Sequence, residues 1–280
     1  MQLSVVIITF NEEANIGRTL QSVQPLVADG KGEIIVVDSG STDRTIEIAK
    51  SYGAKVFIEE WKGYAAQKNS AIDKASGDWI LSLDGDEEVD AELISELNGC
   101  TDDTSKIPGS LREWCLTMRQ SADLDLKGAP KGFFVRRKNF FLGRWIKRGG
   151  FWPDPKLRLF RRGTGRVESR TVHEDFRVEG QTKSIPHGAL IHHSYPTLSD
   201  YIDHMNRYSS LGAEMVVARG KVRFSFVNIV LRPLFTFIYN YLFRLGFLDG
   251  REGLLLHLYH AVYVSWKYAK AWELSRNQSA

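Results

Sequence analysis

The chain has 280 residues, a length that suits one large domain or two small ones. Hydrophobic residues make up 43% of the sequence and charged residues 25%, which excludes a disordered, collagen-like or low-complexity protein. Two cysteines, Cys100 and Cys115, are too few for a disulfide framework and form no zinc-binding C-x-x-C pair. We therefore expect free thiols in a reducing compartment. We expect no secretory signal peptide, because the first apolar run is short and lacks a basic flank.

The formal net charge of +3 hides an uneven distribution along the chain. Residues 1–100 contain 18 acidic and 8 basic side chains, whereas residues 131–170 contain 13 basic and 2 acidic ones. An acidic half and a basic half favour two surfaces with different partners. The alternative is that both are ordinary solvated faces.

The first third of the chain alternates predicted strands with predicted helices. Apolar, β-branched runs predict buried strands at residues 3–10 and 33–38, and further strands are predicted at residues 55–58 and 78–83. Helices are predicted between them at residues 15–23, 45–53 and 63–75. This order predicts an α/β fold with an open, mostly parallel sheet covered by helices on both faces.

The remainder is less regular. Residues 101–130 give no clear pattern, and residues 131–170 contain short strand-like pieces among basic and aromatic residues. A helix is predicted at residues 199–220, and apolar, aromatic-rich helices at residues 224–272. We therefore expect three parts: residues 1–100 and 101–220 as two halves of one domain, and residues 221–280 as C-terminal amphipathic helices.

Carboxylates follow the predicted strands at the edge where open parallel sheets bind their ligands. Asp84 and Asp86 flank a glycine directly after the strand at residues 78–83, so both can converge on one Mg²⁺ or Mn²⁺ ion. A solvated turn is the alternative for an isolated Asp-x-Asp. Neither GxGxxG nor GxxxxGK[ST] occurs in the sequence, so a standard dinucleotide or P-loop site is excluded.

Four segments, VVIITFNEE, IIVVDSGSTD, the helix with Gln67-Lys68-Asn69, and LSLDGDEE, together resemble the nucleotide-binding half of family 2 glycosyltransferases. The resemblance is strong over residues 1–100, and it continues more weakly through WPDPKLRLFRRGTGRVESRTVHED. The chain as a whole is similar to the lipopolysaccharide inner-core β-1,4-glucosyltransferase branch. This resemblance implies the GT-A fold, a Rossmann-like α/β architecture.

The resemblance also implies roles for individual residues in this sequence. Asp84 would contact the ribose or a metal-bound water, and Asp86 would ligate the divalent metal that bridges the two phosphates. The remaining donor-binding residues would hold the uracil and ribose of a UDP-sugar, with Lys68 nearby; they are Thr9, Asn11, Glu12 and Asp38.

Sugar transfer also requires a base that takes the proton from the acceptor hydroxyl. The candidate segment is Val172-His173-Glu174-Asp175. Many family members use the Asp of a Glu-Asp pair, whereas the glucosyltransferase branch favours the Glu, so both Glu174 and Asp175 stay open, with Glu174 preferred. His173 is a candidate third metal ligand or phosphate contact. A surface histidine beside two solvated acids is the alternative.

The basic segment KLRLFRR contains Lys156, Arg158, Arg161 and Arg162. On a strand, Lys156 and Arg158 share a face, and arginine suits bidentate phosphate recognition. We predict that these side chains, Arg158 in particular, meet the diphosphate of the donor or a phosphorylated acceptor. Nucleic acid is the rival ligand, and we predict no nucleic-acid binding because no nucleic-acid-binding motif accompanies the segment.

The C-terminal helices contain apolar stretches that are short for a membrane span. Residues 221–272 carry 7 basic and 2 acidic side chains, with many Tyr and Trp residues of the kind found at membrane interfaces. We predict peripheral or monotopic attachment to an anionic membrane surface. A buried helix pair and an oligomer interface are the alternatives.

These features and the resemblance together predict a metal-dependent glycosyltransferase on the cytoplasmic face of the inner membrane, and the resemblance implies that the enzyme inverts the transferred sugar. The predicted donor is a UDP-sugar, with glucose as the preferred sugar, and the predicted acceptor is a membrane glycolipid such as a lipopolysaccharide inner-core heptose. Three alternatives remain: another lipid-linked or cell-envelope polysaccharide acceptor, a sugar nucleotidyltransferase, and a membrane scaffold with a vestigial nucleotide fold. The acidic Asn11-Glu12-Glu13 after the first strand disfavours a nucleotidyltransferase, which would need a phosphate-binding loop there.

Overall fold

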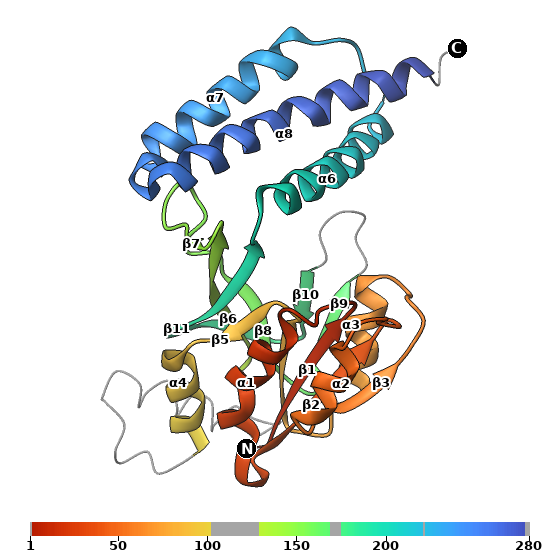
Figure 1. Ribbon diagram of the computed structural model, residues 1–280, viewed down its shortest axis with the longest axis vertical. Helices are drawn as coiled ribbons and strands as arrows, with labels where there is room; N and C mark the ends of the chain where they lie inside the picture. The colour runs from red at the N-terminus through yellow and green to blue at the C-terminus, as the bar shows by residue number, and fades with distance from the viewer. Residues whose placement is uncertain (1, 102–128, 169–174, 221, 278–280) are drawn as a thin grey trace. The chain divides into compact units, whose positions relative to one another are not determined.

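The computed structural model describes residues 2–101, 129–168, 175–220 and 222–277 (Figure 1). The chain divides into two compact units. The first comprises Met1–Arg137 and Pro155–His192, and the second comprises Lys138–Asp154 and His193–Ala280. Each unit is therefore assembled from two separate stretches of sequence.

The first unit is built on a sheet whose N-terminal half is parallel. Its strands are β1 (Leu3–Thr9), β2 (Gly32–Asp38), β3 (Lys55–Ile58) and β4 (Trp79–Asp84), in the order β3-β2-β1-β4. Every residue of β1 is buried, as expected for a continuous apolar run between two neighbouring strands. Thr9 is in register with Asp38, and Ile8 with Asp84, so the three strands end at the same edge.

The other half of the sheet is antiparallel at β4–β8, β8–β6 and β11–β5. Its strands are β5 (Glu87–Val89), β6 (Pro130–Phe141), β8 (Lys156–Arg161) and β11 (Gln181–Tyr195), and the order continues from β4 as β8-β6-β11-β5. A separate hairpin pairs β9 (Gly165–Glu168) with β10 (Asp175–Val178). The predicted parallel arrangement is thus confirmed for the first four strands, and the complete sheet is mixed.

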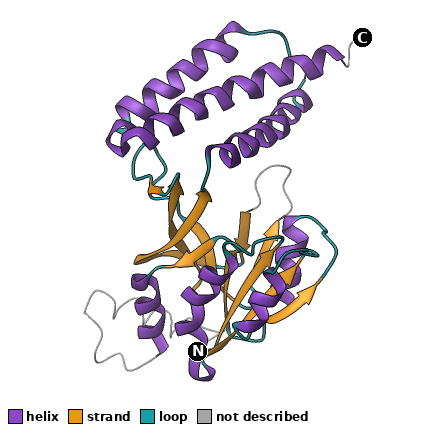
Figure 2. Cartoon of the chain, in the orientation of Figure 1, coloured by secondary structure: helices purple, strands orange, loops and turns teal. Residues whose placement is uncertain are grey.

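Helices cover both faces of the parallel strands, which confirms the predicted layering (Figure 2). They are α1 (Ile16–Val27), η1 (Ala28–Gly30), α2 (Thr45–Ser51), α3 (Tyr64–Asp73) and α4 (Ala91–Thr101). One buried cluster joins Leu20 and Leu93 to alternate residues of β1, such as Val5. The second cluster joins Ala71 of α3 to Val6 of β1. Successive β1 residues therefore point into opposite cores.

The second unit consists of the short strand β7 (Arg144–Trp145) and a set of helices. The helices are α6 (Leu198–Ala218), η3 (Val227–Leu231), α7 (Arg232–Ile238), η4 (Tyr239–Phe243), η5 (Gly246–Asp249) and α8 (Gly250–Asn277). The α6 and α8 helices pack against each other, and a buried cluster is formed by Phe141, Ile146, Tyr201 and Leu256. Helix α8 thus shares a core with α6 and with residues 138–154.

The ends of these helices follow local signals. Thr197 caps α6: its hydroxyl accepts the Asp200 backbone N–H, and the Asp200 carboxylate accepts the Thr197 backbone N–H. The run from η3 to η4 is helical over residues 227–243, with π-helical turns on both sides of α7. Within the described residues, no helix combines the length and the apolarity that crossing a bilayer requires.

Candidate active site

The loops after β1 and β2 are linked by hydrogen bonds at the edge where the strands end. Asn11 has a left-handed φ of 52°, and its backbone N–H donates to Ser41 Oγ at 2.8 Å. The Asn11 side-chain oxygen accepts the Thr42 N–H at 2.9 Å, and the Glu12 N–H donates to Thr45 Oγ1 at 2.7 Å. The predicted residues Asn11 and Glu12 therefore lie in a fixed loop beside the end of β2.

Asp38 closes the turn after β2. Its fully buried carboxylate accepts the backbone N–H groups of Gly40 at 2.9 Å and Ser41 at 2.7 Å. The Ser41 hydroxyl donates to its second oxygen at 2.5 Å. Thr9, the register partner of Asp38, is also buried, and its hydroxyl has no hydrogen-bond partner among the described residues. The structure thus places both residues together at the sheet edge.

Asp84 lies between two cations. One carboxylate oxygen is 2.8 Å from Lys68 Nζ, and the other is 2.6 Å from a terminal nitrogen of Arg158. Burial raises the pKa of the Asp84 carboxyl, but the charges of Arg158 and Lys68 outweigh that effect and hold the pKa well below its usual range. Asp84 is therefore ionised, and both of its oxygens already have partners.

Arg158 also reaches a second carboxylate, Glu87, which the sequence analysis did not assign to the site. The same guanidinium nitrogen donates to Glu87 Oε1 at 2.8 Å, and Arg137 lies 3.3 Å from that oxygen. The Asp84 backbone N–H donates to the other Glu87 oxygen at 3.1 Å. Burial lowers the pKa of the Arg158 guanidinium, and Asp84 and Glu87 raise it above its ordinary value. This cluster fixes the turn that carries Asp86.

Asp86 contacts a residue that sequence reasoning missed entirely. Its carboxylate lies 3.2 Å from Nε2 of His192 on β11, and both side chains are partly exposed. Antiparallel pairing of β11 with β5 aligns His192 with Glu87 and so brings it beside Asp86. The two residues are about a hundred positions apart, and no spacing in the sequence signals their contact.

The acidic side chains at this edge affect one another. Burial is the largest cause that raises the pKa of Glu12, and the charges of Asp86, Asp43 and Asp84 raise it further. The edge of the sheet is thus a place where an added cation would be stabilised. Among the described residues, no three His, Cys, Asp or Glu side chains gather as a ready metal-binding group.

The predicted base segment lies largely outside the described residues. Glu174 and His173 fall in the range 169–174, and Asp175 is the first residue of β10, where only its backbone is described. The neighbouring hairpin is held by α3, because the Asn69 amide bonds the backbone N–H and C=O of Val167, both at 3.0 Å. Phe176 of β10 lies under Lys68 and Arg158, with its ring centre 5.9 and 6.0 Å from their cationic groups.

The other basic residues of the KLRLFRR segment lie in different surroundings from Arg158. Lys156 is half-buried at the start of β8, and Arg161 is largely buried near its end. The Arg162 Nε–H donates to the Gly77 carbonyl at 2.9 Å. From this segment, Arg158 contacts two carboxylates of the site, Asp84 and Glu87.

The fold is that of the GT-A glycosyltransferases. The structure resembles the mannosyltransferase PcManGT from Pyrobaculum calidifontis, solved in complex with GDP-Man and Mn²⁺, with a TM-score of 0.53 and 14% sequence identity. The alignment covers 96% of this chain and 86% of that one. This likeness confirms the predicted fold class.

The comparisons of sequence identify the family. The pattern of the family described as "Glycosyl transferase family 2" matches residues 4–106. The sequence is 30% identical to the lipopolysaccharide core biosynthesis glycosyltransferase LpsC of Rhizobium meliloti, over 98% of this chain and 93% of that protein. It is 28% identical to an uncharacterized glycosyltransferase of Rickettsia typhi, over 98% and 88% of the two chains. The chain belongs to the family 2 glycosyltransferases.

Proposed function

We propose that this glycosyltransferase is a metal-dependent, inverting enzyme that moves a sugar, preferentially glucose, from a UDP-sugar to a membrane glycolipid. One observation carries the proposal: Asp86 and His192 lie 3.2 Å apart beside an ionised Asp84, at the edge where the parallel strands end. Open α/β sheets bind their ligands at this edge.

The donor would occupy the linked loops after β1 and β2. In this assignment Thr9, Asn11, Glu12 and Asp38 contact the uridine, and Lys68 stands near its phosphates. For Arg158 we propose another role than contact with the diphosphate. Its side chain is 5% exposed and holds two carboxylates, so we assign it to positioning Asp84 and Glu87 rather than to contacting the diphosphate.

The residues present fit a divalent cation. Asp86 offers a carboxylate oxygen and His192 an imidazole nitrogen, donors that Mn²⁺ and related ions accept. We propose these two as ligands, with His173 as a third candidate, and Asp84 as a contact to the ribose or to a metal-bound water because its own oxygens are paired. When bound, the cation would neutralise charge on the leaving diphosphate.

The chain itself would supply the base. Either Glu174 or Asp175 takes the proton from the acceptor hydroxyl, and that oxygen attacks the anomeric carbon on the side opposite UDP. A single displacement inverts the configuration at this carbon. Glu174→Gln should therefore abolish transfer without weakening UDP-sugar binding, a loss of about 10²–10⁴-fold. If Asp175→Asn is inactive and Glu174→Gln is not, the base is Asp175.

The name of the Rhizobium relative supports a lipopolysaccharide acceptor. We propose an inner-core sugar such as heptose, with another lipid-linked or cell-envelope polysaccharide as the second candidate. Such acceptors are membrane amphiphiles, so the enzyme would work at a membrane surface.

The second unit offers a surface suited to that membrane. Large apolar side chains on the run from η3 to η4 are exposed, among them Leu234 at 53%, Phe235 at 66% and Phe243 at 74%. The basic residues Arg223 and Arg232 are exposed in the same part of the chain. Exposed apolar groups beside cations suit an anionic lipid surface. We propose peripheral attachment at the cytoplasmic face of the inner membrane through this apolar face, residues 224–248, with an oligomer interface as the alternative.

A donor screen tests the enzymatic proposal. The full-length protein is incubated with individual UDP- and GDP-sugars and Mn²⁺, and release of the nucleoside diphosphate is measured. We expect one UDP-sugar to be consumed fastest and chelation to stop the reaction. Asp86→Asn should abolish turnover, whereas the control Asp73→Asn should not, because Asp73 is an exposed carboxylate on α3 paired with Arg166. Metal-independent turnover, or use of GDP-sugars alone, would contradict the proposal.

A further inference from the structure

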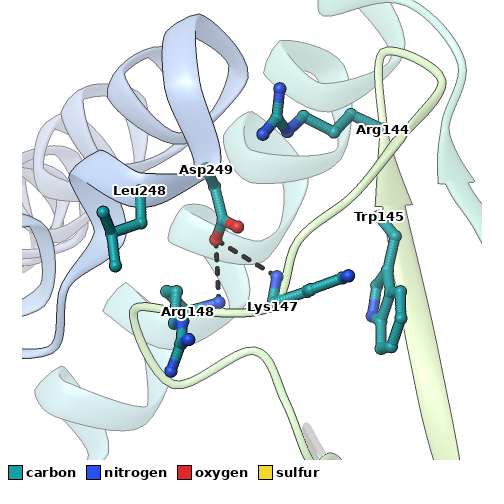
Figure 3. Close-up of a pocket in the computed structure, with 6 residues that line it drawn as sticks. All are labelled: Arg144, Trp145, Lys147, Arg148, Leu248 and Asp249. Carbon is teal, nitrogen blue, oxygen red and sulfur yellow. Dashed lines mark hydrogen bonds between the residues drawn. The ribbon is translucent and has the colours of Figure 1, made fainter.

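A pocket of about 410 Å³ lies in the second unit, between the segment that follows β7 and the start of α8 (Figure 3). Its lining consists of Arg144, Trp145, Lys147, Arg148, Leu248 and Asp249. The volume falls within the range of roughly 300–1,000 Å³ that is typical of small-molecule sites. It exceeds what a single inorganic ion needs, so it suits a larger group that carries an anion.

The wall of this pocket is held in place by hydrogen bonds to the backbone. The Asp249 side chain is buried, and one of its oxygens accepts the backbone N–H groups of Lys147 at 3.1 Å and Arg148 at 2.7 Å (Figure 3). The Gly149 N–H donates to the Arg244 carbonyl at 3.0 Å. The backbone that carries the cationic side chains of this segment is therefore fixed at three points before any ligand arrives.

The cations of the pocket are available to a ligand. In the part of the chain that the structure describes, no carboxylate pairs with the side chains of Lys147 or Arg148, and both are exposed. Lys147 Nζ lies 4.4 Å from the centre of the Trp145 ring. Arg144 pairs with Glu252 at 3.5 Å, and its side chain is 48% exposed. Three cations thus line the pocket together with one carboxylate.

The charge and the rim of the pocket indicate the class of ligand. Glu252 offsets Arg144, and the exposed Lys147 and Arg148 outnumber the Asp249 carboxylate, so the pocket keeps a net positive charge. This charge attracts a phosphate monoester, which carries about −1.5 to −2 at pH 7. Arginine forks bind phosphate oxygens bidentately, and the Trp145 ring adds an apolar wall suited to a sugar. Leu248 of the lining is an exposed apolar residue, and its neighbours in the chain, Leu245 and Phe247, are exposed as well. A cationic pocket next to exposed apolar side chains therefore suits the phosphorylated headgroup of an amphiphile.

We propose that this pocket binds the phosphate monoester of a phosphorylated lipid headgroup at the membrane surface. The inference rests on the proposed membrane attachment of the second unit, but it does not depend on sugar transfer. A soluble sugar phosphate shares the same chemistry, so the experiment has to separate the two sources.

The test uses the full-length protein and neutral vesicles doped with one anionic lipid. One set carries phosphatidic acid, which exposes a phosphate monoester, and the other carries phosphatidylglycerol, a diester, at equal surface charge. We expect tighter binding to the phosphatidic acid vesicles, and loss of that preference by about tenfold or more in the double variant Arg144→Gln/Arg148→Gln. Arg148→Lys should retain part of the preference, because it keeps the charge but loses the fork.

A matched control removes two other exposed cations of the same unit, as Arg219→Gln/Arg223→Gln. It should weaken binding to both kinds of vesicle equally. Equal binding of the unmodified protein to both vesicles, or equal losses in the pocket variant, would overturn the proposal. So would glucose 1-phosphate binding calorimetrically to the pocket without any preference for phosphatidic acid, because the ligand would then be soluble. Because this experiment contains no nucleotide, its outcome does not depend on the outcome of the donor screen.

Discussion

Arg158 neutralises two carboxylates from inside the first unit. Asp84 and Glu87 both contact its guanidinium, and Glu87 is fully buried. Removing one partner of a buried ion pair leaves an uncompensated charge in a medium of low polarity, which is more costly than never having buried the pair.

We therefore expect Arg158→Met to lower the free energy of unfolding by about 3–5 kcal/mol. Lys68→Met should cost less, because Asp84 would keep Arg158 as its partner. Urea denaturation of both variants measures the difference. Equal, small losses in the two proteins would show that the guanidinium is not the main compensation for these carboxylates.

His257 gives the second unit a dependence on pH. It is buried on α8 against Phe151, and neither ring nitrogen has a hydrogen-bond partner among the described residues. Burial, with a smaller contribution from His260, lowers the pKa of His257 to about 4. Between this value and its ordinary pKa near 6.5, the unfolded chain binds a proton that the folded unit does not. Stability is therefore highest above pH 6.5 and falls as the pH drops toward 4.

The variant His257→Phe should remove this slope. A pKa displaced from 6.5 to about 4 corresponds to roughly 3 kcal/mol of stability lost on acidification. The measurement is the free energy of unfolding at several pH values between 4 and 7, for the unmodified protein and the variant. A slope that persists unchanged in the variant would assign the dependence to another group.

At the scale of elements, α4 and β11 meet at a glycine. A Cβ placed on Gly188 would lie 2.4 Å from the Cα of Leu93, so any larger residue would push the helix from the strand. Glu96 of α4 reinforces the contact, since its carboxylate accepts the backbone N–H groups of His187 at 3.0 Å and Gly188 at 2.8 Å.

We expect Gly188→Val to destabilise the protein by about 1–3 kcal/mol or more through overpacking. It should also weaken Mn²⁺ binding at the proposed site, because β11 carries the proposed ligand His192. The control is Ser184→Val, at an exposed position of β11. Gly163→Val is unsuitable as a control, because Gly163 has a positive φ. Thermal unfolding and Mn²⁺ titration together check the prediction, and an unperturbed Gly188→Val protein would contradict it.

The sequence predicts the elements that have local signals and misses those that do not. Strands β1, β2 and β4 lie within a few residues of the predicted ranges, because each is a buried apolar run. Strand β3 also lies where it is predicted, although most of its residues are exposed. The long strand β11 contains Pro186 and Gly188, which disfavour strands, and β6 mixes basic residues with aromatic ones. The absence of a local signal for β11 also explains why the sequence predicts only part of the candidate site. Asp84 and Asp86 directly follow a predicted strand, whereas His192 is brought beside Asp86 by the long-range pairing of β11 with β5.

At the scale of the whole molecule, membrane attachment is best tested by substitutions rather than by truncation. A chain ending near Gly220 would lose Leu256 and with it part of the core shared with Ile146 and Tyr201. Replacing Leu234, Phe235 and Phe243 by serine changes only exposed side chains.

We expect this triple variant to bind anionic vesicles at least about a hundredfold more weakly, because each apolar side chain that is buried contributes about 1.5–3 kcal/mol. High salt should weaken the unmodified protein only partly, since apolar burial is not screened. The control Phe57→Ser/Ile58→Ser, which changes exposed residues of β3, should bind normally. Unchanged vesicle binding with a lower molecular mass would make this face an oligomer interface instead.

The contact between Asp86 and His192 also sets when the proposed metal site forms during folding. It joins segments about a hundred residues apart, and contacts across such long loops close late in folding because of their entropic cost. A chain emerging from the ribosome would thus carry Asp86 long before its partner strand has been synthesised. We expect Mn²⁺ affinity to return in the last phase of refolding, after the helical signal has recovered, so that a nascent or partly folded chain is a poor metal binder and remains inactive until the sheet is complete.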